Sequence, residues 1–314
     1  MALIRKLPIA PNLNFIGHRK IFLAISCAMV LASVILLTSV GLNLGIDFRG
    51  GILIEVRTNG PADLSAMRSR LGSLGLGEVT LQEFGAEDEV LINVQRQEGE
   101  EEAQSAAIAA VKEALGTDVA EYRRTEFVGP KVGGELKEAG AWATVLAILG
   151  IALYVWFRFE WQFAVAALLA LVHDVTAMIG FFAVTQLEFN LATLAAVLTV
   201  AGYSINDTVV IFDRVREVLR KYKKLPLLEL LNMAVNQTMT RTLLTSFTTL
   251  LALVALTLFG GEVIRGFSAS LIWGILIGTY SSVGLAVPLL TFMGLRRTVD
   301  DDEPGKSKSP EKAS

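Results

Sequence analysis

LATLAAVLTVAGYSINDTVVIF, residues 191–212, is an apolar run long enough to cross a bilayer, and it carries an acid, Asp207. A carboxylate in such a run costs roughly 2.5–3.5 kcal/mol on insertion scales, so it is usually retained only where it faces a bundle interior, a partner or a water path. A second acid, Asp174, lies inside another apolar run, and Arg241 opens a third. Together the three residues predict a proton or ion path through a helical membrane protein.

The composition also indicates a membrane protein. Of the 314 residues, 53% are hydrophobic, and the mean hydropathy is +0.52, too apolar for an ordinary soluble domain. Cys27 is the single cysteine of the chain, so an intrachain disulfide is impossible.

Six stretches of the sequence are long and apolar enough to span a bilayer. We therefore predict a polytopic α-helical membrane protein with six transmembrane helices. The first helix is followed by an α+β head domain at 43–138, and the other five form a bundle within 139–292. The predicted spans are 21–42, 139–157, 162–184, 190–212, 242–259 and 267–292.

The distribution of Lys and Arg predicts the orientation in the membrane. These residues cluster in the N-terminal segment 1–20, in the connection 213–241 and in the tail 293–314, whereas the connections on the other face offer only Arg265. By the positive-inside rule, both termini and the basic loop 213–241 are cytoplasmic and the head is exported. The tail is polar, and we expect it to be disordered.

The head has the pattern of a two-layer domain. GILIEVRT predicts a strand from Ile52 to Thr58, and a helix follows with Asp63 near its start and Gly75 near its end. EVTLQEF and EVLINVQR predict two strands joined by a turn at Gly85–Asp88. A second helix, with Ala107, Val111 and Leu115 on one face, and a last strand complete β-α-β-β-α-β, the ferredoxin-like order.

Polar residues inside the predicted spans are the candidate functional groups. Asp207 should lie about 9 Å to the cytoplasmic side of the midplane, with Tyr203 on the same face and Asn206 beside it. The fifth span opens with a polar stripe, which comprises Thr238, Arg241, Thr245, Thr248 and Thr249. A charge pair between Asp207 and Arg241 is the central geometric hypothesis; the alternative is that Arg241 extends to the membrane surface.

Two further acids have open roles. Asp174 lies near the centre of its span, either in the ion path or hydrogen-bonded to Ser or Thr and holding helices together. His173 is next to it but should point about 100° away around the helix. Asp213 is predicted at the membrane boundary, as an interface anchor or as a supporting group of the path. The sequence indicates no metal centre, cofactor site, nucleotide loop or hydrolase constellation.

Three motifs resemble a known family. They are GLNLGIDFRGG at 41–51, VHD at 172–174 and AGYSINDTVVIFDRVRE at 201–217. They look like the SecF family of the bacterial SecDF protein-export complex, which is related to the proton-driven resistance-nodulation-division transporters. The similarity covers nearly the whole chain.

The resemblance implies a translocase subunit, not an enzyme, that couples proton motive force to late steps of polypeptide export. It places the protein in the bacterial inner membrane with a periplasmic head, and Asp207, Arg241 and Asp174 on the proton path. It implies a structural hinge at the family's GG segment, here Gly45, Asp47, Gly50 and Gly51. The implied partners are SecD, the SecYEG channel, YajC, YidC and the exported polypeptide, with no nucleic acid.

A lone six-span half would expose polar faces to lipid, which independently indicates a membrane partner. Two other readings stay open. One is a small-molecule or lipid exporter half of the same superfamily, and the other is a scaffold whose membrane acids only pack helices. The coupling ion, proton or sodium, is also undecided.

Overall fold

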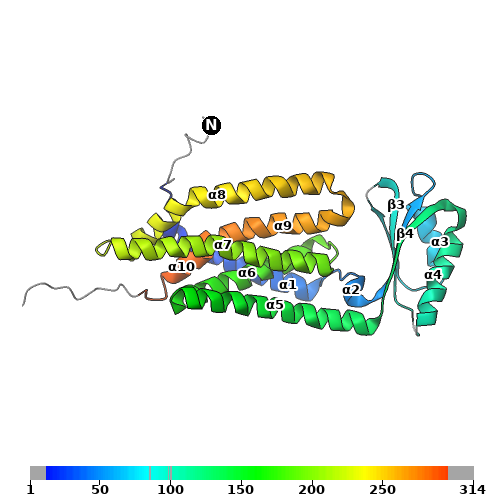
Figure 1. Ribbon diagram of the computed structural model, residues 1–314, viewed down its shortest axis with the longest axis horizontal. Helices are drawn as coiled ribbons and strands as arrows, with labels where there is room; N and C mark the ends of the chain where they lie inside the picture. Colours follow the sequence, from blue (N-terminus) through cyan, green and yellow to red (C-terminus); the bar gives the residue numbers. More distant parts are fainter. Residues whose placement is uncertain (1–11, 85, 98, 100, 296–314) are drawn as a thin grey trace, which may run out of the picture.

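The structure, a computed structural model, describes residues 12–84, 86–97, 99 and 101–295. The molecule is elongated, with a helical bundle at one end and the small α/β head at the other (Figure 1). Residues 1–11 of the predicted N-terminal segment and residues 296–314 of the predicted tail lie outside the described residues.

Six helices of the described chain are long and apolar enough to cross a membrane, which confirms the predicted number. The sixth continues through a π-helical turn, η4 (Ser282–Ala286), into α10 (Val287–Leu290). The bounds of the long helices are α1 (Arg19–Ser39), α5 (Pro130–Arg158), α6 (Trp161–Thr185), α7 (Leu191–Lys221), α8 (Leu227–Phe259) and α9 (Gly261–Ser281). A short turn, η2 (Ile16–His18), precedes α1.

The segment 213–241, predicted as a loop, is largely helical, because α7 continues to Lys221 and α8 begins at Leu227. Hydropathy marks only the part of a helix that crosses the bilayer, whereas Arg, Lys, Glu and Leu continue a helix equally well in water. The chain reverses only between these two helices, where Pro226 precedes the first turn of α8.

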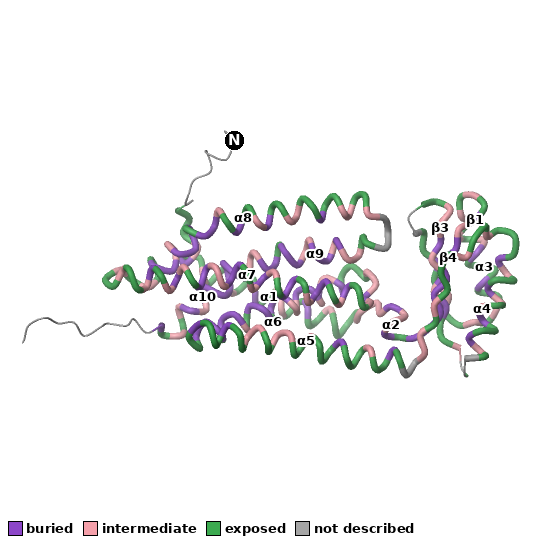
Figure 2. Tube along the Cα trace, viewed as in Figure 1, coloured by how far each residue is buried: buried purple, intermediate pink, exposed green. Residues whose placement is uncertain are grey.

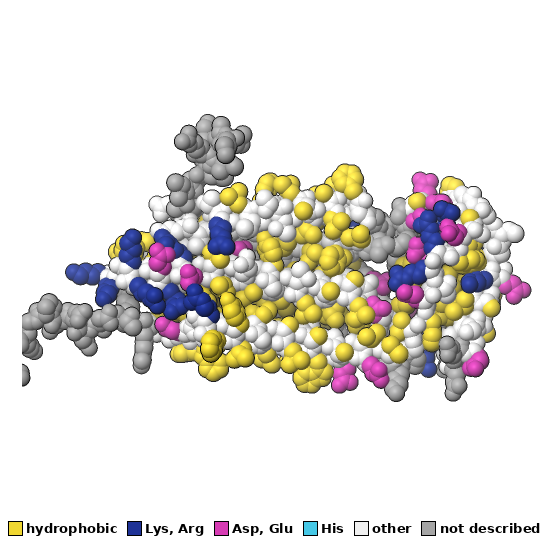
Figure 3. Space-filling model, in the orientation of Figure 1, with side chains coloured by type: hydrophobic (Ala, Val, Ile, Leu, Met, Phe, Trp, Pro, Cys, Tyr) yellow, Lys and Arg dark blue, Asp and Glu magenta, His cyan; other side chains and the backbone are white. Residues whose placement is uncertain are grey.

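The helix α6 and the span formed by α9 and α10 have the largest buried shares of the membrane helices, and Figure 2 draws buried residues in purple. In the apolar windows, 56% of α6 and 72% of the α9–α10 span are buried, against 11% for both α1 and α5. Large apolar side chains on α5 and α8 are exposed, among them Leu153, Phe157, Phe247 and Leu258. On the bundle, Lys and Arg gather at the end away from the head, while its middle is hydrophobic (Figure 3). This surface suits a lipid environment or an apolar partner.

The head has the predicted β-α-β-β-α-β order. Its elements are β1 (Gly51–Thr58), α3 (Leu64–Gly72), β2 (Val79–Phe84), β3 (Ala86–Val94), α4 (Glu101–Leu115) and β4 (Val119–Val128), with a short turn, η3 (Gly116–Asp118), before the last strand. The sheet order is β2-β3-β1-β4, and each neighbouring pair is antiparallel. The fold is therefore ferredoxin-like, as predicted.

The turn between β2 and β3 is shorter than the predicted Gly85–Asp88. Phe84 pairs with Ala86, and β3 already begins at Ala86. Gly85 lies outside the described residues. Glu87 and Asp88 were predicted to lie in the turn because they are polar, but polar side chains are compatible with a strand that has one solvated face.

The helices α3 and α4 cover the face of the sheet that points away from the bundle (Figure 1). Ala107, Val111 and Leu115 are buried against this face, as their spacing on α4 predicted. The Asp63 carboxylate caps α3 by accepting a hydrogen bond from the Ala66 N–H at 2.9 Å. The opposite face of the sheet is turned toward the bundle.

Candidate functional site

Asp207 lies inside the bundle, on the buried face of α7. Its side chain is 4% exposed, and its Oδ2 has no hydrogen-bond partner among the described residues. A buried carboxylate oxygen without a partner costs free energy, and such groups are rare in folded proteins. Among the described residues, this oxygen therefore has unused capacity to accept a hydrogen bond.

Two hydrogen bonds fix the register of α7 against α8. The Tyr203 and Thr249 hydroxyls lie 3.4 Å apart, and Arg214 Nε donates to Gln237 Oε1 at 2.7 Å. The two helices are antiparallel, so a step up in residue number on one is matched by a step down in residue number on the other. Counting from the first bond places residue 245 opposite Asp207, and counting from the second places residue 244 there.

Thr245, and not Arg241, therefore shares the depth of Asp207. Arg241 lies about one helical turn, roughly 6 Å, farther from the head. Its side chain is exposed, and no ion pair within 4.0 Å joins it to Asp207 in the described chain. The direct charge pair is thus not formed among the described residues.

The threonines of the predicted polar stripe on α8 form their hydrogen bonds within the helix itself. Thr245, Thr248 and Thr249 each donate to a backbone carbonyl one turn earlier in the same helix, at 3.1, 3.0 and 2.9 Å. These hydroxyls are satisfied within the helix and tolerate apolar surroundings. Thr242, which the sequence did not single out, is buried with its Oγ1 unpartnered among the described residues.

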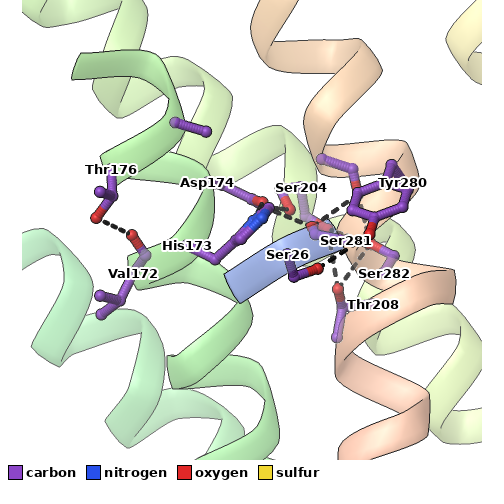
Figure 4. A network of polar contacts seen from close by, with 12 residues as sticks. Ser26, Val172, His173, Asp174, Thr176, Ser204, Thr208, Tyr280, Ser281 and Ser282 are labelled. Carbon is purple, nitrogen blue, oxygen red and sulfur yellow. Dashed lines mark hydrogen bonds and ion pairs between the residues drawn. The ribbon is translucent and has the colours of Figure 1, made fainter. Parts of the chain in front are cut away.

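Asp174 is fully buried on α6 and lies at the centre of a polar network (Figure 4). Its Oδ2 accepts hydrogen bonds from Ser204 of α7 at 2.5 Å and from Ser281 of α9 at 2.7 Å. Its Oδ1 lies 2.9 Å from His173 Nδ1. This carboxylate therefore bridges three helices and has its hydrogen-bonding capacity well occupied.

The contact between His173 and Asp174 corrects the prediction that the two side chains diverge. Adjacent Cβ atoms on a helix do point about 100° apart, but rotation about χ1 and χ2 brings the imidazole back over the carboxylate. His173 is 3% exposed, and its Nε2 has no partner in the described part of the chain.

The serines where α9 ends and η4 begins, Ser281 and Ser282, were not predicted from the sequence. Ser282 Oγ lies 2.8 Å from Thr208 Oγ1, and Tyr280 OH lies 3.0 Å from Ser26 Oγ of α1. A Cβ on Gly278 would lie 2.9 Å from Ser204 Cβ, so a glycine is needed where α9 approaches α7. The available signal was the polar cluster TYSS, 279–282, within an apolar run.

Two other predicted residues face outward. Asn206 is exposed on the side of α7 away from the bundle core. Asp213 is also exposed and forms an ion pair with Arg158, at 3.1 Å, where α5 ends. Neither contacts the Asp174 network, which places both at a surface and not on the internal face of α7.

The GG segment forms a neck between α1 and the head. Gly45 N donates to Phe189 O at 2.9 Å, and the Phe48 and Phe189 rings stack with centroids 5.8 Å apart. Asp47 Oδ2 accepts from the Leu191 N–H at 2.9 Å, so the neck caps the first turn of α7. The neck is thus attached to the helix that carries Asp207, and its role as a hinge stays a prediction.

Glycines let the neck leave its short helix, α2 (Ile46–Arg49), and enter β1. Gly50 has φ +72° and Gly51 has φ +143°, conformations that side chains disfavour. A Cβ on Gly133 of α5 would lie 3.1 Å from Gly50 N, so α5 packs closely on the neck. The positive φ angles and the close packing of α5 explain why glycines occur at this junction.

Glu188 is a titratable group beside the neck and outside the long helices. Burial raises the pKa of its carboxyl group, a hydrogen bond from Asn190 Nδ2 at 3.4 Å lowers it, and the nearby Asp47 charge raises it, with a net increase. No cluster of three or more His, Cys, Asp or Glu side chains suited to a metal occurs among the described residues.

Comparison with known proteins gives the family. Residues 107–296 match the family "Protein export membrane protein SecD/SecF, C-terminal", and residues 35–62 match the "SecD/SecF GG Motif". The protein translocase subunit SecF of Rickettsia felis is 46% identical over 297 residues, which cover 94% of this chain and 96% of that protein. The chain belongs to the SecF family. The SecF of Rickettsia bellii is 45% identical over 94% of this chain and 97% of its own.

Solved structures agree with this SecF assignment. The crystal structure of SecDF, a translocon-associated membrane protein from Thermus thermophilus, has a TM-score of 0.81 and 33% identity. It matches 91% of this chain, which spans 39% of that SecDF chain. The super-membrane-facing form of SecDF gives a TM-score of 0.68 at 33% identity, over 90% of this chain and 39% of that one. This SecF-family chain is a multi-pass membrane subunit of a protein translocase and not an enzyme.

Proposed function

We propose that this SecF-family subunit couples proton movement across the bacterial inner membrane to late steps of polypeptide export, with Asp207 as the proton-carrying group. The observation that carries the proposal is the buried Asp207 carboxylate, whose Oδ2 has no partner in the described chain. A group that only packs helices would have both oxygens satisfied, as Asp174 does.

The proposed orientation follows the positive charge on the bundle. Arg214, Arg216, Arg220 and Lys221 lie at the end of the bundle away from the head, and cytoplasmic segments are rich in such residues. Both termini are then cytoplasmic and the head is periplasmic. Protons driven by the membrane potential enter from the head side.

Arg241 serves as the switch partner of Asp207 in this proposal. An ionised Asp207 attracts the guanidinium from one turn away, and a protonated Asp207 does not. Arginine stays charged, so the proton on the acid alone decides the attraction. Each proton gains about 2.3 kcal/mol per 100 mV, which is enough to bias the position of α8 against α7.

The neck passes such a movement to the head. Asp47 caps α7, so a shift of that helix displaces the segment that leads into β1. A cleft of about 540 Å³ lies between the neck and the bundle-facing side of β2 and β3, lined among others by Arg49, Glu188 and Asn93. This space lets the head tilt as the neck moves.

Further subunits complete the machine. Gly202 and Asn206 are exposed on α7, and a polar amide facing lipid is unfavourable, which supports a SecD subunit packed on this surface. The complex acts beside the SecYEG channel, with YajC and YidC as further partners and the exported polypeptide as substrate. Asp213 contributes a charge at the cytoplasmic end of the proton path and does not itself carry the proton.

The test is translocation of a precursor protein into inner-membrane vesicles, at equal abundance of the assembled complex. Asp207→Asn keeps the shape of the side chain but cannot carry a proton. It should remove the part of translocation that depends on the membrane potential and leave the rest. Asp213→Asn is the matched control, since Asp213 is exposed and paired with Arg158, and it should change little. Unchanged translocation by Asp207→Asn would overturn the proposal.

A further inference from the structure

A buried histidine that the proposed proton path does not use lies behind Asp207. His173 and Asp174 are adjacent on α6, almost fully buried, and joined through Nδ1 and Oδ1 at 2.9 Å. A carboxylate so buried must be hydrogen-bonded to be tolerated, and the donors to Asp174 come from His173, Ser204 and Ser281. His173 is the one of these that belongs to the same helix as the acid.

The network holds one particular turn of α7. Ser204 and Thr208 bracket Asp207, and neither of the two residues that bind them belongs to α8. Ser204 donates to Asp174, and Thr208 meets Ser282 of η4 at 2.8 Å. The turn that carries Asp207 is thereby fixed to α6 and to a π-helical turn, a local irregularity often found at functional sites (Figure 4).

We propose that His173 is a positioning residue, whose Nδ1–H donates to the Asp174 carboxylate and keeps it oriented toward Ser204 and Ser281. We call these four residues the clamp. The clamp fixes the turn of α7 that carries Asp207 and presents that side chain to α8. The clamp rests on the proposed function only for the role of Asp207. His173 acts as a hydrogen-bond donor and carries no proton along the path. Asp174 likewise acts as an acceptor that ties three helices together.

The surroundings of the His173–Asp174 pair are consistent with His173 as a permanent hydrogen-bond donor to Asp174. The titratable side chain that faces the pair is Tyr280 of α9, whose ring centroid lies 6.2 Å from that of His173, and the Asp207 of α7 comes three residues after Ser204. On α1 the neighbouring groups are Ser26, bound to Tyr280, and the exposed Cys27. No Lys or Arg of the described chain forms an ion pair with Asp174, which leaves His173 as its basic neighbour.

A pair of substitutions separates donor from proton carrier. The amide nitrogen of Asn can replace His Nδ1, so His173→Asn keeps the donor but loses the titratable ring. His173→Leu loses both. We expect His173→Asn to retain potential-driven translocation with an unchanged pH profile, and His173→Leu to lose about tenfold or more. A His173→Asn variant as inactive as His173→Leu would overturn the positioning role.

A second readout follows the clamp without translocation. In the assembled complex with Cys27→Ser, spin labels at Arg220 of α7 and at Phe292, just after α10, report the distance between these helices. Both side chains are exposed. His173→Asn should keep the wild-type distance distribution, and His173→Leu should shift or broaden it. An unchanged distribution in His173→Leu would overturn the clamp. A broadened distribution in His173→Leu would support the clamp. If Asp207→Asn kept the potential-dependent translocation, that result would overturn the proposed function and leave the clamp standing.

Discussion

Asp47 and Leu191 connect the neck directly to the helix of the candidate proton carrier: the Asp47 carboxylate accepts a hydrogen bond from the Leu191 N–H at 2.9 Å. An acid at this place neutralises the positive end of the α7 dipole and satisfies one of its free N–H groups. A single side chain thus links the entry to the head with the span that contains Asp207.

Asp47→Ala should lower the free energy of unfolding by about 1 kcal/mol and also weaken potential-driven translocation. Thermal unfolding of the purified complex and the vesicle assay measure the two effects. Asp63→Ala is the matched control, because it removes an equivalent cap from α3 inside the head. It should cost similar stability without loss of coupling. Equal loss of coupling in both variants would contradict a special role for the neck.

Gly278→Ala should destabilise the bundle by about 1–3 kcal/mol, because its Cβ would lie 2.9 Å from Ser204 Cβ and push α9 away from α7. Gly150→Ala on α5 meets no atom within 4 Å and should be neutral or slightly stabilising. Denaturation midpoints of the two variants in detergent give the comparison. A neutral Gly278→Ala would mean that the two helices are not held this closely.

Arg241→Lys should keep part of the potential-driven translocation, and Arg241→Gln should lose it. Arg241 forms no ion pair within 4.0 Å of Asp207 in the described chain, so its charge matters more than the planar shape of its guanidinium. The measurement is the initial rate of precursor import at a fixed potential. Activity of Arg241→Gln at the Arg241→Lys level would exclude a charge effect.

Glu188 predicts a pH dependence of stability at the head end of the bundle. Its folded-state pKa is raised above the ordinary 4.5, chiefly by burial, so the folded protein holds this proton more tightly than the unfolded chain. At low pH, Glu188 is protonated and its burial does not lower the free energy of unfolding. As the pH rises from about 4.5 through the folded-state pKa, the carboxyl group must ionise while buried, and the free energy of unfolding falls. Glu188→Gln imitates the protonated form and should match wild type in acid but exceed it near neutrality. Parallel unfolding midpoints from pH 4 to pH 8 would contradict this.

The sequence was sufficient for the architecture because hydropathy and alternation report burial directly. The six spans, the ferredoxin-like order and the inward face of Ala107, Val111 and Leu115 all followed from periodicity. The error at 213–241 arose because apolar length gives the extent of the membrane, and a helix can extend beyond it. Residue types such as those of Arg220 and Lys221 continue a helix in water.

The site was harder to predict because depth depends on how two helices slide past each other. Nothing in the separate patterns of α7 and α8 places Thr245, and not Arg241, opposite Asp207; only the Tyr203–Thr249 contact does so. Hydrogen bonds from Ser or Thr were one of the two predicted roles of Asp174, and Ser204 and Ser281 do bind it, but the sequence did not indicate which residues these would be. The donors to Asp174 come from three helices, and the bond from His173 depends on side-chain rotation, which helical spacing does not report.

Proton transport can be measured in right-side-out vesicles that contain the complete complex and enclose the precursor, so that the head faces outward, with an internal pH dye and an inside-negative potential. Wild type should admit protons while a polypeptide is being exported, and Asp207→Asn should reduce this influx to the level of vesicles without the complex. Equal influx in wild type and Asp207→Asn would contradict a proton-carrying Asp207. If export instead depends on a sodium gradient, with no proton influx, the coupling ion is sodium and not the proton.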